Sequence, residues 1–207
     1  KFTFNPFQEN TYVLHADGEG IVVDPGCSTI NEQRELERWL ESNGILPVRL
    51  LLTHAHIDHI MGCAWLEERF GLKPELHRKD LPIMQAAEMQ GAMFGLRIDP
   101  PPAPARFIEA GEVISLGDEH LDVLFVPGHA PGHIAFYNPK QRFILSGDVL
   151  FHRSIGRTDL PGGDMDTLLE SIRTQLYPLG DDITVYCGHG PETTIGEERR
   201  GNPFVNW

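Results

Sequence analysis

The 207-residue chain has few cysteines, and its three, Cys27, Cys63 and Cys187, include no CxxC pair. A sparse and odd-numbered set does not build a disulfide framework and is typical of a reducing compartment. The sequence also lacks an apolar run near the roughly 18 residues that suggest a membrane span. Its first residues, Lys1 to Pro6, lack the basic start and apolar run of a signal peptide. We therefore expect a cytoplasmic protein with no membrane partner.

Positive charge is scarce as well. The chain has 17 lysines and arginines against 30 acidic residues, a formal net charge of −13, and no basic cluster. Nucleic-acid binding depends on neutralising phosphates with cations, so this balance argues against a nucleic-acid partner. The hydrophobic fraction of 41% is ordinary for a globular protein. At this length, one domain over residues 1–207 is the simplest organisation.

Strand and helix patterns alternate along the chain. Short β-forming runs predict strands over residues 11–14, 21–24, 48–52, 75–77, 113–116, 121–125, 134–137, 143–145 and 183–186. Apolar residues at helical spacing predict helices over residues 29–42, 60–70, 81–90 and 165–176. A tight turn is expected at Asp17-Gly18-Glu19-Gly20, and a stiff connector at residues 100–104. Strand clusters alternating with surface helices predict a layered α/β sandwich.

Side chains of the metal-ligand type follow several predicted strands. The segment Thr53-His54-Ala55-His56-Ile57-Asp58-His59 offers four candidate ligands directly after the strand at 48–52. Three later strand ends each add one more beside a glycine, namely His129, Asp148 and His189. Imidazole and carboxylate suit zinc, and strand ends meeting at one edge would form one site. Seven residues in equivalent contexts favour a shared site over unrelated surface loops or one structural zinc, which commonly takes thiolates.

The order of these motifs, H-x-H-x-D-H, G-H, S-G-D and G-H-G, resembles that of the metallo-β-lactamase-fold hydrolases. Within that family the chain is similar to the glyoxalase II-like (hydroxyacylglutathione hydrolase) branch, in its short bacterial single-domain form. The motifs extend from Thr53 to Gly190, and the resemblance covers nearly the whole chain, including the stretches Ser-Gly-Asp-Val-Leu-Phe and Ile-Gly-Arg-Thr-Asp. It implies a four-layer αββα sandwich with two metal ions at one edge.

By this resemblance, three residues would hold the first metal, three the second, and Asp148 would bridge them. The first set is His54, His56 and His129, and the second is Asp58, His59 and His189. We expect two divalent ions per chain. Zinc is the first choice, and iron and manganese are the alternatives, because all three accept such ligands. Two adjacent ions can lower the pKa of a shared water toward about 7 and polarise a carbonyl. Asp58 is the candidate catalytic proton shuttle.

The expected substrate is a small-molecule thioester such as S-lactoylglutathione, with no obligate protein partner. Arg157 is the candidate substrate-binding residue, since glyoxalase II-like enzymes contact glutathione with a basic residue at this place. Their tyrosine two positions later is Asp159 here, so Arg157 serves equally well as an ion-pair partner. The helical domain with which full-length glyoxalase II contacts glutathione has no counterpart before Trp207, so we expect weak glutathione affinity.

Other functions remain open. Sulfur dioxygenases resemble this pattern while using a subset of the ligands, so persulfide oxidation by a single iron is one alternative. Hydrolysis of another ester or of a lactone is a second. β-Lactam hydrolysis is disfavoured because Asp148 occupies the bridging place, where the best-known lactamases use a cysteine or lack a bridging carboxylate. Behind the ligands, Thr53 and Asp24 are expected to orient imidazoles, and His133 is either exposed or part of that supporting layer.

Overall fold

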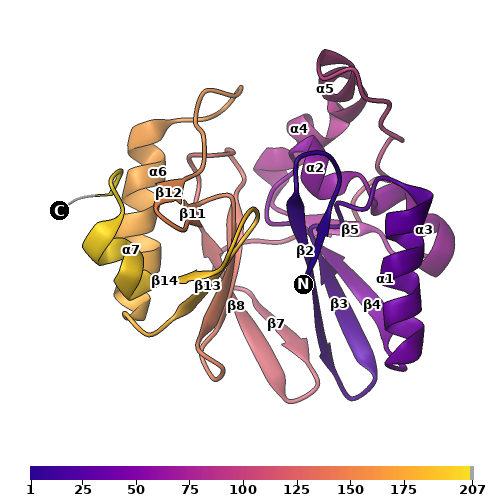
Figure 1. Cartoon of the computed structure of the whole chain (residues 1–207), viewed down its shortest axis with the longest axis horizontal. Coiled ribbons are helices and arrows are strands. Elements are labelled where there is room, and N and C mark those ends of the chain that lie inside the picture. Colours follow the sequence, from indigo (N-terminus) through magenta and orange to yellow (C-terminus); the bar gives the residue numbers. More distant parts are fainter. Residues whose placement is uncertain (206–207) are drawn as a thin grey trace.

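Two six-stranded β-sheets form the centre of the fold in the computed structural model, which describes residues 1–205 (Figure 1). The first sheet has the order β1 (Phe2–Phe4), β2 (Glu9–Ala16), β3 (Glu19–Val23), β4 (Leu46–Leu51), β5 (Pro74–Leu76) and β6 (Arg106–Phe107). The second has the order β14 (Thr193–Thr194), β13 (Thr184–Cys187), β10 (Phe143–Gly147), β9 (Ile134–Asn138), β8 (Glu119–Phe125) and β7 (Val113–Leu116). A separate two-stranded ribbon pairs β11 (Leu150–Phe151) with β12 (Ser154–Ile155).

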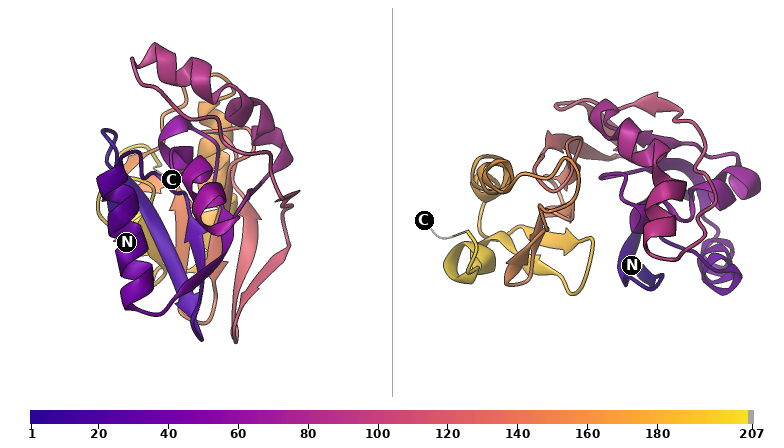
Figure 2. Two further views of the ribbon diagram at one scale, coloured as in Figure 1. Left: turned by 90° about the vertical axis from the view of Figure 1, so that its right-hand side faces the viewer. Right: turned by 90° about the horizontal axis from the view of Figure 1, so that it is seen from above.

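Helices lie on the outer flanks of this pair of sheets, as the view from above in Figure 2 shows. The first flank carries α1 (Ile30–Ser42) and α3 (Cys63–Phe70), and the second carries α6 (Met165–Ser171), the π-helical turn Ile172–Leu176 and α7 (Ile195–Gly201). Shorter elements are α2 (Ile57–Ile60), the 3₁₀ turns Arg78–Asp80 and Tyr177–Leu179, α4 (Leu81–Gln85) and α5 (Ala87–Met93). Within residues 1–205, no helix combines the length and the apolar character that crossing a membrane requires.

Three apolar clusters fill the spaces between the four layers. The cluster under the first helices contains Leu36, Leu40, Val22 and Leu50; the one between the sheets contains Ile21, Leu51, Val123 and Phe136; the third contains Ile144, Val185, Leu168 and Ile172. β4 is buried on both faces, since Leu50 and Leu51 belong to different clusters, which explains its continuous apolar run. The four-layer αββα sandwich is therefore confirmed.

Several local predictions differ from the structure. The helix expected at residues 60–70 is divided into α2 and α3 at Gly62, whose N–H donates to the Pro25 carbonyl at 2.7 Å. A side chain at Gly62 would also meet Cys27 Sγ at 2.5 Å, so this close approach requires glycine. The turn after β2 consists of Asp17 and Gly18 alone, both with positive φ. The prediction missed α7, although Thr194 caps it by accepting the Glu197 N–H.

Candidate metal centre

Four strand ends bring the seven candidate ligands to one edge of the sandwich. β4 leads into the loop with His54 and His56, and α2 then carries Asp58 and His59. β8 leads to His129. β10 and β13 run parallel with Gly147 opposite Cys187, and the Gly188 N–H donates to the Gly147 carbonyl at 2.9 Å. This register places Asp148 and His189 beside each other at the carboxyl ends of the two strands, and all seven residues come together.

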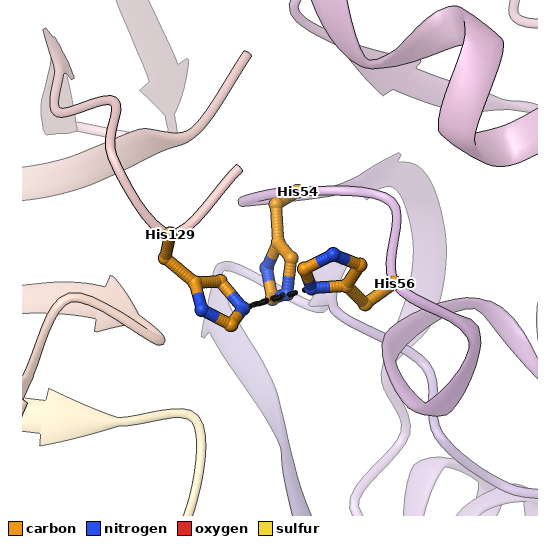
Figure 3. A group of neighbouring side chains, drawn as sticks. All are labelled: His54, His56 and His129. Carbon is orange, nitrogen blue, oxygen red and sulfur yellow. Dashed lines mark hydrogen bonds between the residues drawn. The ribbon is translucent and has the colours of Figure 1, made fainter. Parts of the chain in front are cut away.

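The first cluster consists of His54, His56 and His129, whose ring nitrogens point toward one another (Figure 3). His129 Nε2 lies 3.2 Å from His54 Nε2 and 2.8 Å from His56 Nδ1. Three imidazoles from two distant segments thus aim nitrogen atoms at one point. Burial, together with the neighbouring His129, lowers the pKa of His56 to about 3, so its ring is neutral and has a free lone pair.

The second cluster consists of Asp58, His59 and His189. His189 Nε2 lies 3.1 Å from Asp58 Oδ2, and His59 Nε2 lies 3.6 Å from the same oxygen. Asp148 stands between the two clusters: its Oδ2 lies 3.5 Å from His129 Nε2 and 3.4 Å from His189 Nε2. The Asp148 carboxylate therefore faces a candidate ligand of each cluster.

Two buried atoms at the centre of this arrangement have no hydrogen-bond partner, namely His59 Nε2 and Asp148 Oδ1. They lie 3.4 Å apart. Buried polar atoms are normally satisfied, so each unpartnered one requires an explanation. Imidazole nitrogens and carboxylate oxygens converging in this way fit divalent cations, to which both atoms could donate lone pairs once a metal displaces any proton between them.

Each of four candidate ligand histidines uses its Nδ1 for a hydrogen bond away from the cluster. The pairs are His54 with the Thr53 hydroxyl at 3.0 Å, His59 with Asp24 at 3.1 Å, His129 with the Arg157 carbonyl at 2.7 Å and His189 with the Phe7 carbonyl at 3.1 Å. A carbonyl or carboxylate partner requires a protonated Nδ1, and that leaves the Nε2 lone pair for a metal. His56 differs, because its Nδ1 is the atom that faces the cluster.

Asp24 and Thr53 orient two of these rings, as the sequence predicts. Asp24 accepts the Thr53 N–H and the Thr53 hydroxyl, both at 2.7 Å. Since the hydroxyl donates its hydrogen bond to Asp24, it can only accept one from His54 Nδ1, and this fixes the tautomer of His54. His133 is fully buried, stacks on the His54 ring at 4.7 Å and accepts the Asp148 N–H. The exposed alternative for His133 is therefore wrong.

Asp80 supports the site but carries no signal in the sequence. It is fully buried, and its carboxylate accepts the N–H of Ala55, between two ligands of the first cluster, and the N–H of Gly132, just after His129. Asp80 thus joins the two loops that form the first cluster. Its position before Leu81 resembles an ordinary helix cap, yet its side chain makes no capping hydrogen bond to α4.

Replacing Asp80 by alanine should destabilise the fold by about 2 to 4 kcal/mol, because two buried N–H groups lose their acceptor. Asp80→Asn keeps one acceptor oxygen but turns its NH2 group toward the other N–H, so its loss should be of similar size. Urea unfolding of the metal-free variants measures both losses. An alanine variant as stable as the parent would show that Asp80 does not join these loops.

Glu9 is a second buried carboxyl that the sequence does not reveal. Its Oε2 accepts the Thr11 hydroxyl at 2.9 Å, and its unpartnered Oε1 lies 3.8 Å from His59 Nδ1. Burial raises the pKa of Glu9 well above its usual value, against the opposing effect of His59. Glu9 thus adds a further acidic group behind the second cluster.

Loading metal at pH 7 should release about two protons per chain. Burial alone would lower the pKa of His189, but hydrogen bonds to Asp148 and Asp58 raise it to about 10, and the same carboxylates raise that of His59. Both rings are therefore protonated at pH 7 in the metal-free protein, and a metal must displace these protons. Apparent metal affinity should accordingly rise with pH.

Calorimetric zinc titrations in two buffers of different ionisation enthalpy measure this proton release directly. A heat of binding that is the same in both buffers would contradict it.

Arg157 lies at the rim of the site. Its guanidinium pairs with Asp159 through two hydrogen bonds of 2.6 and 2.7 Å, and its carbonyl anchors His129. The ion-pair alternative is thus present in the structure, while contact with a substrate stays a prediction.

A cavity of about 810 Å³ opens directly onto the two clusters, and its lining includes His56, Asp58, His129, Asp148 and His189. Structural zinc sites are closed by four protein ligands, whereas catalytic sites keep a position open for water or substrate. The candidate centre is of the open kind.

Comparisons with known proteins agree with this geometry. A family model described as the metallo-beta-lactamase superfamily matches residues 4–189. Hydroxyacylglutathione hydrolase GloC of Haemophilus influenzae is 40% identical over 203 residues, which cover 97% of this chain and 94% of that protein. The crystal structure of TTHA1623 in a di-iron-bound form has a TM-score of 0.90 and 41% identity, and covers 98% of both chains. That of BLEG-1 B3 metallo-beta-lactamase has a TM-score of 0.90 and 36% identity, over 99% of this chain and 98% of its own.

Proposed function

Because the chain belongs to the metallo-β-lactamase superfamily, we propose that it is a metal-dependent hydrolase with a dinuclear site that cleaves a small-molecule thioester. The observation that carries this proposal is the position of Asp148, which faces His129 of the first cluster and His59 and His189 of the second. A single metal site would need no carboxylate between two complete sets of ligands.

The proposed ligands follow the two clusters. His54, His56 and His129 would hold one ion, Asp58, His59 and His189 the other, and Asp148 both. Zinc and iron both suit this donor set, and the relative TTHA1623 is described with two irons. When bound, the ions would supply a water of lowered pKa and a Lewis acid for the carbonyl.

Asp58 is the residue we propose to move the proton. It lines the cavity, and one of its oxygens contacts His189. Burial opposes ionisation of Asp58, but His59 and His189 lower its pKa, so it is a carboxylate at pH 7 and can accept a proton from water. Around Asp58, the hydrogen bonds that four of the candidate ligand histidines make through Nδ1 hold their rings in place.

The thioester class is supported by the 40% identity with GloC, which is described as a hydroxyacylglutathione hydrolase. A β-lactam is the second candidate, because a relative of 36% identity is described as a B3 metallo-beta-lactamase. Persulfide oxidation by one iron would leave Asp58, His59 and His189 without a role, which argues against it.

A substrate panel combined with elemental analysis of natively expressed protein tests the proposal. S-Lactoylglutathione, a lactone, a chromogenic β-lactam and glutathione persulfide with oxygen monitoring represent the four chemistries. We expect two metal equivalents per chain and the highest kcat/KM with the thioester. One iron per chain with oxygen consumption on the persulfide would replace this proposal.

A further inference from the structure

The cavity beside the candidate metal centre has an apolar wall that the hydrolytic chemistry does not require. One side is built from α4, α5 and the residues beside them, which contribute Ile83, Ala86, Met89, Met93 and Phe94. The opposite side includes Phe151, Ile155, Leu160 and Pro161. The metal-centre residues line the same cavity, so a bound molecule can touch both regions.

Three side chains of this wall are strongly exposed to solvent. Met93 is 79% exposed, Met89 is 67% exposed and Phe94 is 52% exposed. Large apolar groups gathered at the mouth of a cavity indicate a surface that an apolar ligand covers. Methionine suits this role because its flexible side chain adapts to chains of different shape.

Phe7 connects this wall to the metal centre. Its ring packs edge-on against Phe94 at a centroid distance of 5.4 Å, while its carbonyl accepts a hydrogen bond from the ligand His189. Figure 1 shows α5 above the edge of the first sheet, on the side of the molecule where β2 begins. A molecule whose carbonyl is bound at the clusters can therefore also contact the apolar wall.

Away from the metal centre, the charge of the lining favours an apolar group over a strongly anionic one. Apart from the candidate ligands, the cationic residues among the lining residues are Lys79 and Arg157. Arg157 is already paired with Asp159 through two hydrogen bonds, and the Lys79 ammonium lies over the Phe125 ring at 4.8 Å. Both side chains have partners within the protein, so neither is free to bind an anionic group along the apolar wall.

We propose that the preferred substrates are thioesters with an extended apolar acyl chain, which lies along Met89, Met93 and Phe94 while its carbonyl reaches the metal centre. This inference rests on the proposed hydrolase function and names its substrate class. Hydrolysis adds water across the C–S bond and yields a fatty carboxylic acid and a free thiol. The short lactoyl group would leave most of the wall uncovered.

A chain-length series on the metal-loaded full chain tests the inference. S-Acyl derivatives of N-acetylcysteamine, from acetyl through hexanoyl to octanoyl, keep the thiol small and neutral, and a thiol reagent measures its release. We expect kcat/KM to rise about two- to fourfold per methylene, as burial of each group predicts. Equal rates across the series would overturn the inference and leave the hydrolase function intact.

Met93→Gln and Met89→Gln should reduce the ratio of octanoyl to acetyl kcat/KM by about three- to tenfold. Both side chains are exposed, so these changes do not disturb the core. Met165→Gln is the matched control, since Met165 is 43% exposed on α6 and is not part of the cavity lining. A ratio lowered equally by the control would contradict the proposed wall.

Two further outcomes separate the remaining explanations. If no thioester of any length is hydrolysed, the proposed function fails and the inference falls with it. If sedimentation shows a dimer that Met93→Gln dissociates, a second copy of the chain covers this wall, and the inference is overturned. A monomer with a chain-length preference supports it.

Discussion

Asp58→Asn is expected to lower kcat on a thioester by about 10²- to 10⁴-fold, the range that a positioned general base contributes. The asparagine amide has nearly the shape of the carboxylate and keeps an oxygen for the contact with His189. It cannot accept a proton at neutral pH. Metal content should therefore fall far less than turnover, and this difference identifies a proton shuttle.

Asp182→Asn is the matched control for this experiment. Asp182 is an exposed carboxylate paired with Arg142, outside the cavity lining, so its substitution removes the same charge without touching the site. Steady-state kinetics and elemental analysis are measured on both variants. If kcat of Asp58→Asn falls only in proportion to lost metal, Asp58 is a ligand and not the shuttle.

Asp148→Ala should have the second large effect, with metal content falling from two equivalents to one or fewer and kcat falling by about 10³-fold or more. This carboxylate faces candidate ligands of both clusters. Its loss removes the shared ligand, and with it several kcal/mol of transition-state stabilisation.

Proton release on metal loading offers an independent readout of the same variant. Asp148 is a principal group that raises the pKa values of His59 and His189. Without it both rings should be less protonated at pH 7, so fewer protons should be released when metal binds. A variant with two bound metals and unchanged proton release would show that Asp148 does not bridge the clusters.

The convergence of the seven ligands was predictable from local signals. His54 to His59 follow a strand that the apolar run at residues 48–52 predicts, and His129, Asp148 and His189 each stand beside a glycine at a strand end. These local signals can be recognised without tertiary information, because a buried strand, a glycine and a polar residue each have their own physical requirements. The metals themselves and the roles of the seven residues stay predictions.

The supporting layer could not be predicted in full. Asp80 acts through backbone N–H groups of Ala55 and Gly132, which are 25 and 52 positions from it, and no sequence spacing indicates that contact. The sequence allowed an exposed and a supporting position for His133 equally, because the burial of His133 depends on stacking against His54. The apolar wall of the cavity depends on how α5 packs beside the site. In the sequence, the exposed methionines of α5 look like those of an ordinary surface helix.

Anomalous diffraction from crystals of the metal-loaded protein tests the central claim most directly. The account predicts two peaks per chain, one within about 2.0 to 2.2 Å of nitrogens of His54, His56 and His129, and one at similar distances from Asp58, His59 and His189. Asp148 should lie between the two peaks. A single peak, or a second peak away from these side chains, would contradict the dinuclear site.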